Sequence, residues 1–415
     1  MSILDRFRRA AAKSTAQWIA AYVTNSDTLD RRSSINVDQA ALVARAHGWV
    51  FRAAAQNARS TVCNNPLRMY TPAGNKAASK LYGTRSLTRS RRLWINKRGP
   101  INMGAKAVQY AELAGEVEEV IDHPALRLLR FGNDYMSGLE LLELTCLFRE
   151  LAGNAYHHVA IEGGEPVALW PLMPQHTFII ADERDFIRHY ISGRQGHLVH
   201  TFQPDEVIHY KHMQSPVEPF YGYSWLRAAV YAADIYTSSR IHEKAVWDNG
   251  ARPDYAVMLK GSNYTTEQAE RMRRQLTSKH GGPEKAGQPV VMAANDIEIK
   301  PLGFTPREME YIEGLGSVRD EIMALADIPK SLYTSDDVNL ANAEVGNRLY
   351  AEQAILPRLT KLADTLTDQL LPYYGIEPGE MWFGFDNPVP EDEAQQLERR
   401  GRMQLQGVMT VNEWR

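Results

Sequence analysis

The sequence predicts an α+β protein, and three observations carry this prediction. Apolar residues recur at helical spacing near the N-terminus, most clearly over residues 37–60. Between residues 154 and 210 the period changes to the alternation that is typical of strands. The helical period returns over residues 225–247 and again toward the C-terminus. Helices and mostly antiparallel strands therefore occupy separate blocks of the chain.

The composition bounds the classes of function. The 415 residues predict two or three domains or one elaborated unit, and 44% hydrophobic residues suffice for a buried core. The net charge of −3 excludes a whole-chain basic binder of nucleic acid, although not a protein past which nucleic acid slides. The two cysteines, Cys63 and Cys146, build neither a disulfide framework nor a C-x-x-C zinc site.

Two basic stretches leave alternatives open. Residues 1–23 are amphipathic and rich in arginine, which fits a plain N-terminal arm, a presequence or a membrane-surface helix. No apolar run is long enough to span a bilayer, so we expect a soluble cytoplasmic protein with no membrane partner. Residues 85–98, which contain Trp94, could contact phosphate, but a solvated loop or an acidic neighbour explains them equally well.

The first half of the chain predicts two helices followed by strands. The helices begin at His123-Pro124 and at Ser137, and the second runs to Leu151. A hairpin follows, with strands over 154–161 and 167–170 around a turn at 162–165. Further strands are expected over residues 176–181, 186–192, 197–202 and 206–210.

The second half predicts a helix, a small α/β insert and two more long helices. The first helix, 225–247, ends at Asn249-Gly250. Thr305, Pro306 and Glu308 form a strong helix start, and this helix should run to about Ala326. The remaining elements are strands at 255–259, 290–292, 297–299 and 381–385, a helix opened by Thr265, a polar loop at 330–340, a helix over 342–371 kinked at Pro357, and a last helix opened at Pro390.

No recognised catalytic motif is present, and we expect no enzyme activity, metal or cofactor. The chain lacks a Walker loop, an H-E-x-x-H and a G-x-S-x-G motif. Eight of the twelve histidines fall in the β region, among them His209-x-x-His212. Residues three apart on a strand face opposite sides, which is poor geometry for one ion. A metal-dependent DNA-processing enzyme that uses these histidines is the alternative function.

Six segments in this order resemble the portal proteins of tailed double-stranded DNA phages. The resemblance covers about residues 40–415. The segments are Gly153–Tyr156 with Pro166–Leu172, Asp205–His209, Tyr221–Leu226, Asn249–Pro253, Ile322–Leu332, and Phe385-Asp386.

The resemblance implies a structural ring, with no catalysis of its own, at a capsid vertex of the virion. Such rings usually hold twelve copies and conduct double-stranded DNA, without sequence specificity, during packaging and ejection. The implied partners are the terminase large subunit, a head–tail adaptor, and the major capsid and scaffold proteins. Assembly would take place in the host cytoplasm.

The same resemblance implies a division of the chain. The expected parts are an N-terminal arm (1–36), wing (37–222), stem helix one (223–250), clip (251–303), stem helix two (304–327), tunnel loop (328–342), wing return with the kinked helix (343–386) and the start of a crown (387–415). Because the sequence ends at Asn412–Arg415 in mid-helix without a C-cap, we expect the crown to be short or truncated.

Two groups of residues are the expected channel sites. Residues 303–327 carry six acids against two arginines, and a ring of such helices would repel DNA phosphates over about 8–10 Å. The alternative is that these acids face neighbouring subunits or solvent. The expected stem-lining residues are Glu308, Glu310, Glu313, Asp320 and Glu321; those of the tunnel loop are Lys330, Ser331, Tyr333, Asp336, Asp337 and Asn339, with Lys330 the best candidate for a phosphate contact.

Overall fold

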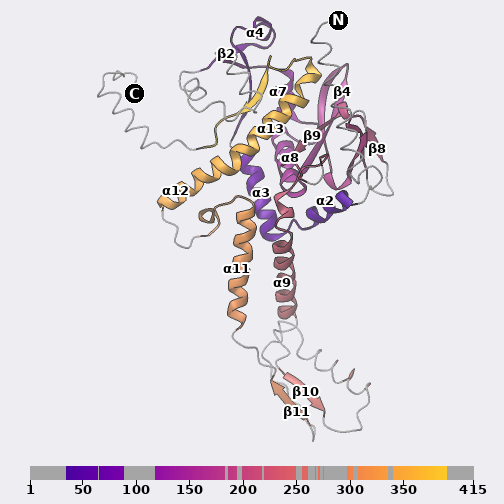
Figure 1. Ribbon diagram of the computed structural model, residues 1–415, viewed down its shortest axis with the longest axis vertical. Helices are drawn as coiled ribbons and strands as arrows, with labels where there is room; N and C mark the ends of the chain where they lie inside the picture. Colours follow the sequence, from indigo (N-terminus) through magenta and orange to yellow (C-terminus); the bar gives the residue numbers. More distant parts are fainter. Residues whose placement is uncertain are drawn as a thin grey trace, which may run out of the picture. The chain divides into compact units, whose positions relative to one another are not determined.

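The chain divides into two units in a computed structural model. Residues 229–322 form one unit, called here the inserted unit, and the segments before and after it form the other, the flanking unit (Figure 1). The structure describes residues 34–389 except 64, 88–116, 183–185, 194–198, 217–218, 249–254, 260–266, 268–269, 272–273, 275–296, 302–306 and 335–339. Across these residues we find no helix with the length and apolar character that a membrane span requires.

Several expectations lie outside the described residues. These are the N-terminal arm up to residue 33, Trp94 with most of the basic stretch, the Thr265 helix start, the strand at 290–292, and the segment from Pro390 onward. The described residues form both helices and sheets, as the sequence predicts.

The helical spacing expected over 37–60 is confirmed, but the segment consists of two helices separated by a break. Helix α2 spans Ser34–Ala44 and α3 spans Gly48–Val62. Between them His47 has an extended backbone (φ −127°), and Gly48 restarts the helix at φ +49°. A positive φ is easily reached only by glycine, which explains why the break falls here.

A four-stranded antiparallel sheet joins early and late parts of the chain. Its order is β12-β1-β3-β2, with β1 at Leu67–Pro72, β2 at Thr84–Ser86, β3 at Val117–Val120 and β12 at Trp382–Phe385; α4 (Lys76–Tyr82) connects β1 to β2. Arg68 ties the strands together, because its guanidinium donates to Glu119 at 2.6 Å and to Asp386 at 2.8 Å. The short strand predicted at 381–385 is thus confirmed.

Two helices follow at the predicted positions. Helix α7 spans Pro124–Phe131, with proline in its first turn. Helix α8 spans Gly138–Ala152 and begins with a reciprocal capping box between Ser137 and Glu140. It ends at Gly153 in the left-handed conformation and packs against α3. Both predicted helices are confirmed, and α8 ends one residue after the predicted Leu151.

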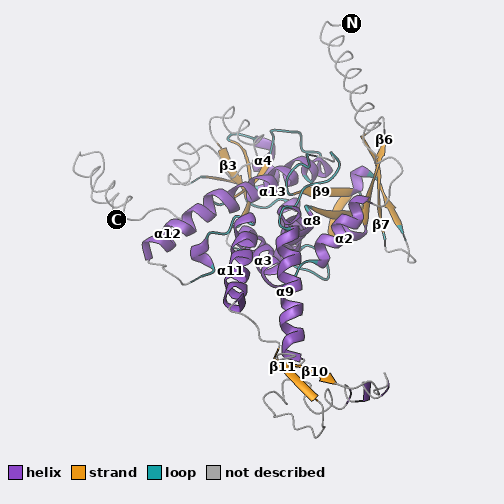
Figure 2. Cartoon of the chain, turned by 60° about the horizontal axis from the view of Figure 1, so that its bottom comes forward, coloured by secondary structure: helices purple, strands orange, loops and turns teal. Residues whose placement is uncertain are grey.

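Two three-stranded antiparallel sheets make up the histidine-rich region (Figure 2). The predicted hairpin is confirmed, with a turn at Gly163-Gly164, and β8 begins three residues later than predicted. One sheet has the order β5-β4-β9, with β4 at Asn154–Glu162, β5 at Glu165–Leu172 and β9 at Val207–Lys211; the other has the order β6-β7-β8, with β6 at Thr177–Asp182, β7 at Phe186–Ser192 and β8 at His200–Phe202.

The described residues of the inserted unit include two long helices and a two-stranded sheet. Helix α9 spans Val230–Asp248, and strands β10 (Tyr255–Leu259) and β11 (Ile297–Pro301) pair antiparallel. Helix α11, Arg307–Leu325, crosses the end of this unit. The elements follow the predicted order.

The last long helix is irregular where a kink is predicted. Helix α12 (Leu340–Leu349) passes into a π-helical segment, Tyr350–Ile355, and then into α13 (Leu356–Gln369). Pro357 lies just after the π segment, where a missing N–H and a bulky ring disturb the regular ladder. The predicted stripe of Ile355, Leu359, Leu362, Leu366 and Leu370 is fully buried, so the helical period is confirmed.

Candidate functional site

The expected tunnel-loop residues are described only at the start of the loop. Lys330–Leu332 form one 3-10 turn after Pro329. Lys330 is exposed, and the Tyr333 ring lies 6.5 Å from the Trp49 ring on α3. Asp336, Asp337 and Asn339 lie outside the described residues.

The start of this loop lies against α12 through a glycine. A Cβ placed on Gly346 would lie 2.0 Å from the Ser331 Oγ, which is closer than any real contact. Glycine within a helix lowers stability relative to alanine. The close approach of Ser331 explains why a residue without a side chain occupies position 346.

Gly346→Ala is therefore expected to lower the melting temperature, because overpacking costs about 1–3 kcal/mol while helix propensity returns only about 1 kcal/mol. Gly314→Ala in α11 is the matched control, since its Cβ would meet no atom within 4 Å. Calorimetry should show opposite shifts for the two variants. A rise for both would contradict the close contact.

The expected stem residues lie on α11. Glu308, Glu310 and Glu313 are helical, and their side chains lie outside the description. Asp320 is half-buried and lies 2.8 Å from Arg319, while Glu321 is exposed. These acids belong to the inserted unit and the start of the tunnel loop to the flanking unit, so the structure assigns the two groups no common site.

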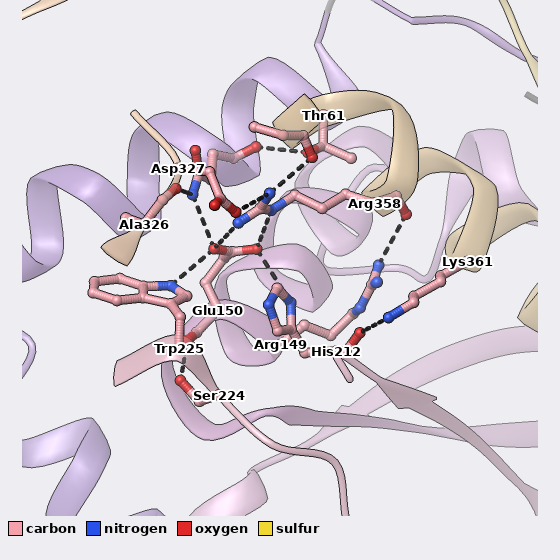
Figure 3. Close-up of polar contacts among 12 residues, drawn as sticks. Thr61, Arg149, Glu150, His212, Ser224, Trp225, Ala326, Asp327, Arg358 and Lys361 are labelled. Atoms are coloured by element: carbon pink, nitrogen blue, oxygen red, sulfur yellow. Dashed lines mark hydrogen bonds and ion pairs between the residues drawn. The ribbon is translucent and has the colours of Figure 1, made fainter. Parts of the chain in front are cut away.

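The flanking unit instead contains a buried polar network centred on Glu150 of α8, which no sequence motif indicates (Figure 3). Arg358 of α13 donates to both carboxylate oxygens, at 2.7 and 3.2 Å. Trp225 Nε1 and Asn57 Nδ2 each donate to the same carboxylate at 3.0 Å. Four donors from three other parts of the chain therefore meet at one anion.

The two points where the chain leaves and re-enters the flanking unit both join this network. Before the inserted unit, the Ser224 hydroxyl donates to the backbone carbonyl of Glu150 at 2.5 Å. After it, the Ala326 carbonyl accepts from Asn57 at 2.9 Å, and Asp327 accepts from Arg358 at 3.2 Å. One network thus fixes the residues that precede α9 and those that follow α11.

The π-helical segment is bound to the same network. The Tyr350 hydroxyl donates to Asn57 Oδ1 at 2.8 Å, and the Ala354 carbonyl accepts from Arg358 at 2.7 Å. Asp327 closes α11 with φ +61°, a conformation uncommon outside glycine. The network therefore connects the π-helical segment to the residues that precede and follow the inserted unit.

Charge pairing decides the ionisation of the network. Burial opposes the charge on Glu150, but Arg358 and the hydrogen bonds outweigh it and lower the pKa of the carboxyl to about 2. Burial lowers the pKa of His212 to about 4, so this ring, 3.4 Å from Glu150, is neutral at pH 7. Burial also lowers the pKa of Arg149, whose Nε and Nη2 have no hydrogen-bond partner. Glu150 is consequently the buried counter-charge of Arg358.

A second contact supports the segment before α9. A Cβ on Gly222 would lie 2.1 Å from the Gly153 carbonyl oxygen, so the two backbones touch. Asn154 Oδ1 accepts from the Gly222 N–H at 2.5 Å and lies 3.0 Å from His209 Nε2. The close contact explains why glycine occurs in both motifs.

The structure gives His209 and His212 separate partners. His209 stacks on Tyr156 and contacts Asn154, whereas His212 lies beside Glu150. No group of three or more potential metal-ligating side chains occurs in the described part of the chain. The arrangement therefore provides no support for the alternative metal-dependent enzyme.

The sequence gives only a weak indication of the residues in this network. Glu150 lies between apolar positions of an amphipathic helix, and Arg358 directly precedes Leu359 of the buried stripe. Charged residues on a buried face are rarely unpaired, which would have marked both as candidates. Their pairing across 208 residues had no local signal.

Known proteins with a similar sequence or a similar fold identify the family of this chain. Two proteins called uncharacterized, from Rickettsia bellii (strain RML369-C) and Rickettsia felis (strain ATCC VR-1525 / URRWXCal2), are each 26% identical over 276 residues, which are 65% of this chain and 71% of the relative. A chain from the virion of a native gene transfer agent particle has a TM-score of 0.59 at 22% identity, covering 95% of this chain and 94% of its own.

A chain from the neck of the native particle, computed with C12 symmetry, has a TM-score of 0.52 at 28% identity and covers 70% of this chain and 82% of its own. The family described as phage portal protein matches residues 102–415, from before β3 to the end of the sequence. This match spans well over half of the chain, and the protein therefore belongs to the phage portal protein family.

Proposed function

We propose that the protein forms a homo-oligomeric ring of twelve copies at a capsid vertex and conducts double-stranded DNA during packaging and ejection. The observation that carries the proposal is the family match together with the similarity to chains of gene transfer agent particles. Neck structures of those particles were computed with C12 and C6 symmetry. A closed ring is the usual solution for such repeated head-to-tail contacts.

The proposed division of the chain gives each part a role. The inserted unit would supply the stem helices and the clip, and the flanking unit the wing, the tunnel loop and the start of the crown. The limits of the inserted unit, 229–322, fall inside the segment 223–327 assigned to stem and clip, which supports this mapping. The Glu150 network would then anchor both stem helices to the wing.

The proposed partners follow from the same mapping. The clip would contact the terminase large subunit during packaging and the head–tail adaptor afterwards, and the wing would contact the capsid and scaffold proteins. The acids of α11 would line the channel and keep DNA from binding tightly. The protein would be found in the virion and, during assembly, in the host cytoplasm.

Mass photometry of the purified protein at two salt concentrations tests the ring. We expect a species near twelve times the chain mass of 46.9 kDa, with a central hole in negative-stain images. A protein that stays monomeric or dimeric at both salt concentrations would contradict the proposal.

Replacing residues 335–339 by a glycine–serine linker tests the conduit separately. We expect rings of unchanged mass that package or retain less DNA in particles, because the loop is assigned to the channel and not to subunit contacts. Loss of the ring would contradict this assignment, and so would unimpaired packaging.

A further inference from the structure

The buried face of the long C-terminal helix, which runs through α12 and α13, changes its spacing at one point (Figure 1). From Ile355 to Leu370 the buried stripe advances by steps of four or three residues. On the N-terminal side the buried face contains Tyr350 and Gly346, and the step from Tyr350 to Ile355 is five residues. An α-helix returns to the same face after three or four residues. The two buried faces are therefore separated by one residue more than an α-helix needs.

An unbroken α-helix would bury a different face of α12. The positions seven and eleven residues before Ile355 share its face in an α-helix, but they hold Arg348 and Glu344, and both are exposed. The buried positions are those of Tyr350 and Gly346 instead. One residue corresponds to about 100° of rotation in an α-helix. The extra residue thus turns α12 so that its charged side chains stay at the surface.

The backbone shows where the extra residue is accommodated. The Leu356 N–H donates to the carbonyl of Ala351, five residues earlier, in the manner of a π-helix. Glu352 and Gln353 are exposed, whereas the other four residues of the π-helical segment are buried. Pro357 explains why the ladder is interrupted at this point, since proline has no N–H to donate to the Gln353 carbonyl. The extra residue therefore lies on the solvent side of the helix.

Contacts on both sides of the segment fix the rotation of the helix. The Tyr350 hydroxyl donates to Asn57 Oδ1 at 2.8 Å, and Gly346 lies against the Ser331 side chain. The stripe on α13 is completely buried. A turn of α12 by 100° would break both contacts of α12, and the same turn of α13 would expose its leucines. The helix can therefore satisfy both faces only by keeping the extra residue between them.

We propose that the π-helical segment Tyr350–Ile355 is a register device: its one extra residue sets the rotation of α12 so that Gly346 faces Ser331 at the start of the 330–340 loop. The device makes the two directions of length change unequal. Deletion of one residue from the segment gives a regular α-helix that keeps both faces, whereas insertion of one residue turns α12 by about a further 100°. The proposal concerns the single chain and does not depend on ring formation.

Melting temperatures of matched length variants test this asymmetry. We expect deletion of Gln353 to change the melting temperature by less than about 2 °C, and insertion of one alanine after Gln353 to lower it by at least about 5 °C. Deletion of the exposed Lys361 in regular α13 should also lower it by at least about 5 °C, because Leu359 and Leu362 then no longer share a face. Lys361→Ala measures separately the loss of its hydrogen bond to the His212 carbonyl. Equal losses on deletion of Gln353 and of Lys361 would overturn the proposal.

Disulfide trapping in the Cys63→Ser background reads the rotation of α12 directly. A Cβ placed on Gly346 would lie 3.2 Å from the Ser331 Cβ, close to the separation in a disulfide. Ser331→Cys with Gly346→Cys should cross-link within one chain, and deletion of Gln353 should leave the rate unchanged. Insertion of alanine after Gln353 should slow cross-linking at least about tenfold. Loss of the cross-link on deletion, an unchanged rate on insertion, or no cross-link in any variant would overturn the proposal.

Discussion

Replacing Glu150 by glutamine is expected to lower the free energy of unfolding of the flanking unit by about 3–5 kcal/mol. The substitution keeps the volume and a hydrogen-bonding group, but it leaves the guanidinium of Arg358, which is 6% exposed, without the buried carboxylate that it binds. The other carboxylate bound to Arg358 is Asp327, whose side chain is 57% exposed and therefore offers less compensation. Urea unfolding at pH 7, followed by tryptophan fluorescence, measures the loss.

The control for this prediction is an ion pair of similar length at the surface. Arg59 and Glu143 lie 3.0 Å apart, with side chains 67% and 33% exposed, and Glu143→Gln should cost less than about 1 kcal/mol. The double variant Glu150→Gln/Arg358→Met should lose less than the sum of its single variants, because it removes both buried charges together. Equal losses at the surface and buried pairs would contradict a central role for Glu150.

The functional consequence of the same variant concerns the ends of the inserted unit. Ser224 and Trp225 precede that unit and Ala326 follows it, and all three bind to Glu150 or to its partner Asn57. We therefore expect Glu150→Gln to loosen both ends together, which hydrogen exchange at residues 224–227 and 323–328 would detect as parallel losses of protection. Loss at one end alone would contradict a shared anchor.

Local signals explain how much of the fold could be predicted. The caps of α7 and α8, the glycine turn of the β4–β5 hairpin and the leucine stripe of α13 all act within a few residues, and each of these elements was predicted correctly. The break at Gly48 was missed, because the apolar period continues through it. The irregularity near Pro357 was predicted, but its π-helical form was not. The spacing of apolar residues alone does not predict such local changes in backbone geometry.

The contacts of the candidate site, in contrast, could not be predicted from local sequence signals. Gly222 and Gly153 belong to two separate sequence motifs, and only the folded structure shows that their backbones are in contact. Glu150, Arg358 and Asn57 stand far apart in the chain, and no motif joins them. Pairing of buried charges is a tertiary property, so a single sequence can mark the candidates but not the partners.

Lowering the pH from 7 to about 4.5 is expected to unfold the flanking unit, with the uptake of three to four protons. Four of its histidines are at most 6% exposed or almost enclosed, and burial is the main cause that lowers their pKa values. The pKa falls from 6.5 to about 4 for His123 and His212, to about 3 for His157, and well below 6.5 for His209.

The direction follows from proton linkage. Below about pH 6.5 the unfolded chain binds protons at these histidines and the folded chain does not. The free energy of unfolding therefore decreases as the pH is lowered, until the pH reaches the pKa values of the folded state. At about 1.4 kcal/mol per group and pH unit, four groups remove roughly 10 kcal/mol by pH 4.5, comparable with the whole stability of a domain. Glu150, whose pKa is lowered from 4.5 to about 2, adds a further loss only below about pH 4.5.

The number of protons can be measured directly, because the slope of the unfolding free energy against pH gives the difference in bound protons. Urea titrations at intervals between pH 7 and 5 should give a slope equivalent to three to four protons near pH 5.5. His157→Gln should reduce that slope by about one proton, since its ring is enclosed by Thr145 and Tyr210. A slope below two protons would show that the buried histidines do not govern the acid sensitivity of this fold.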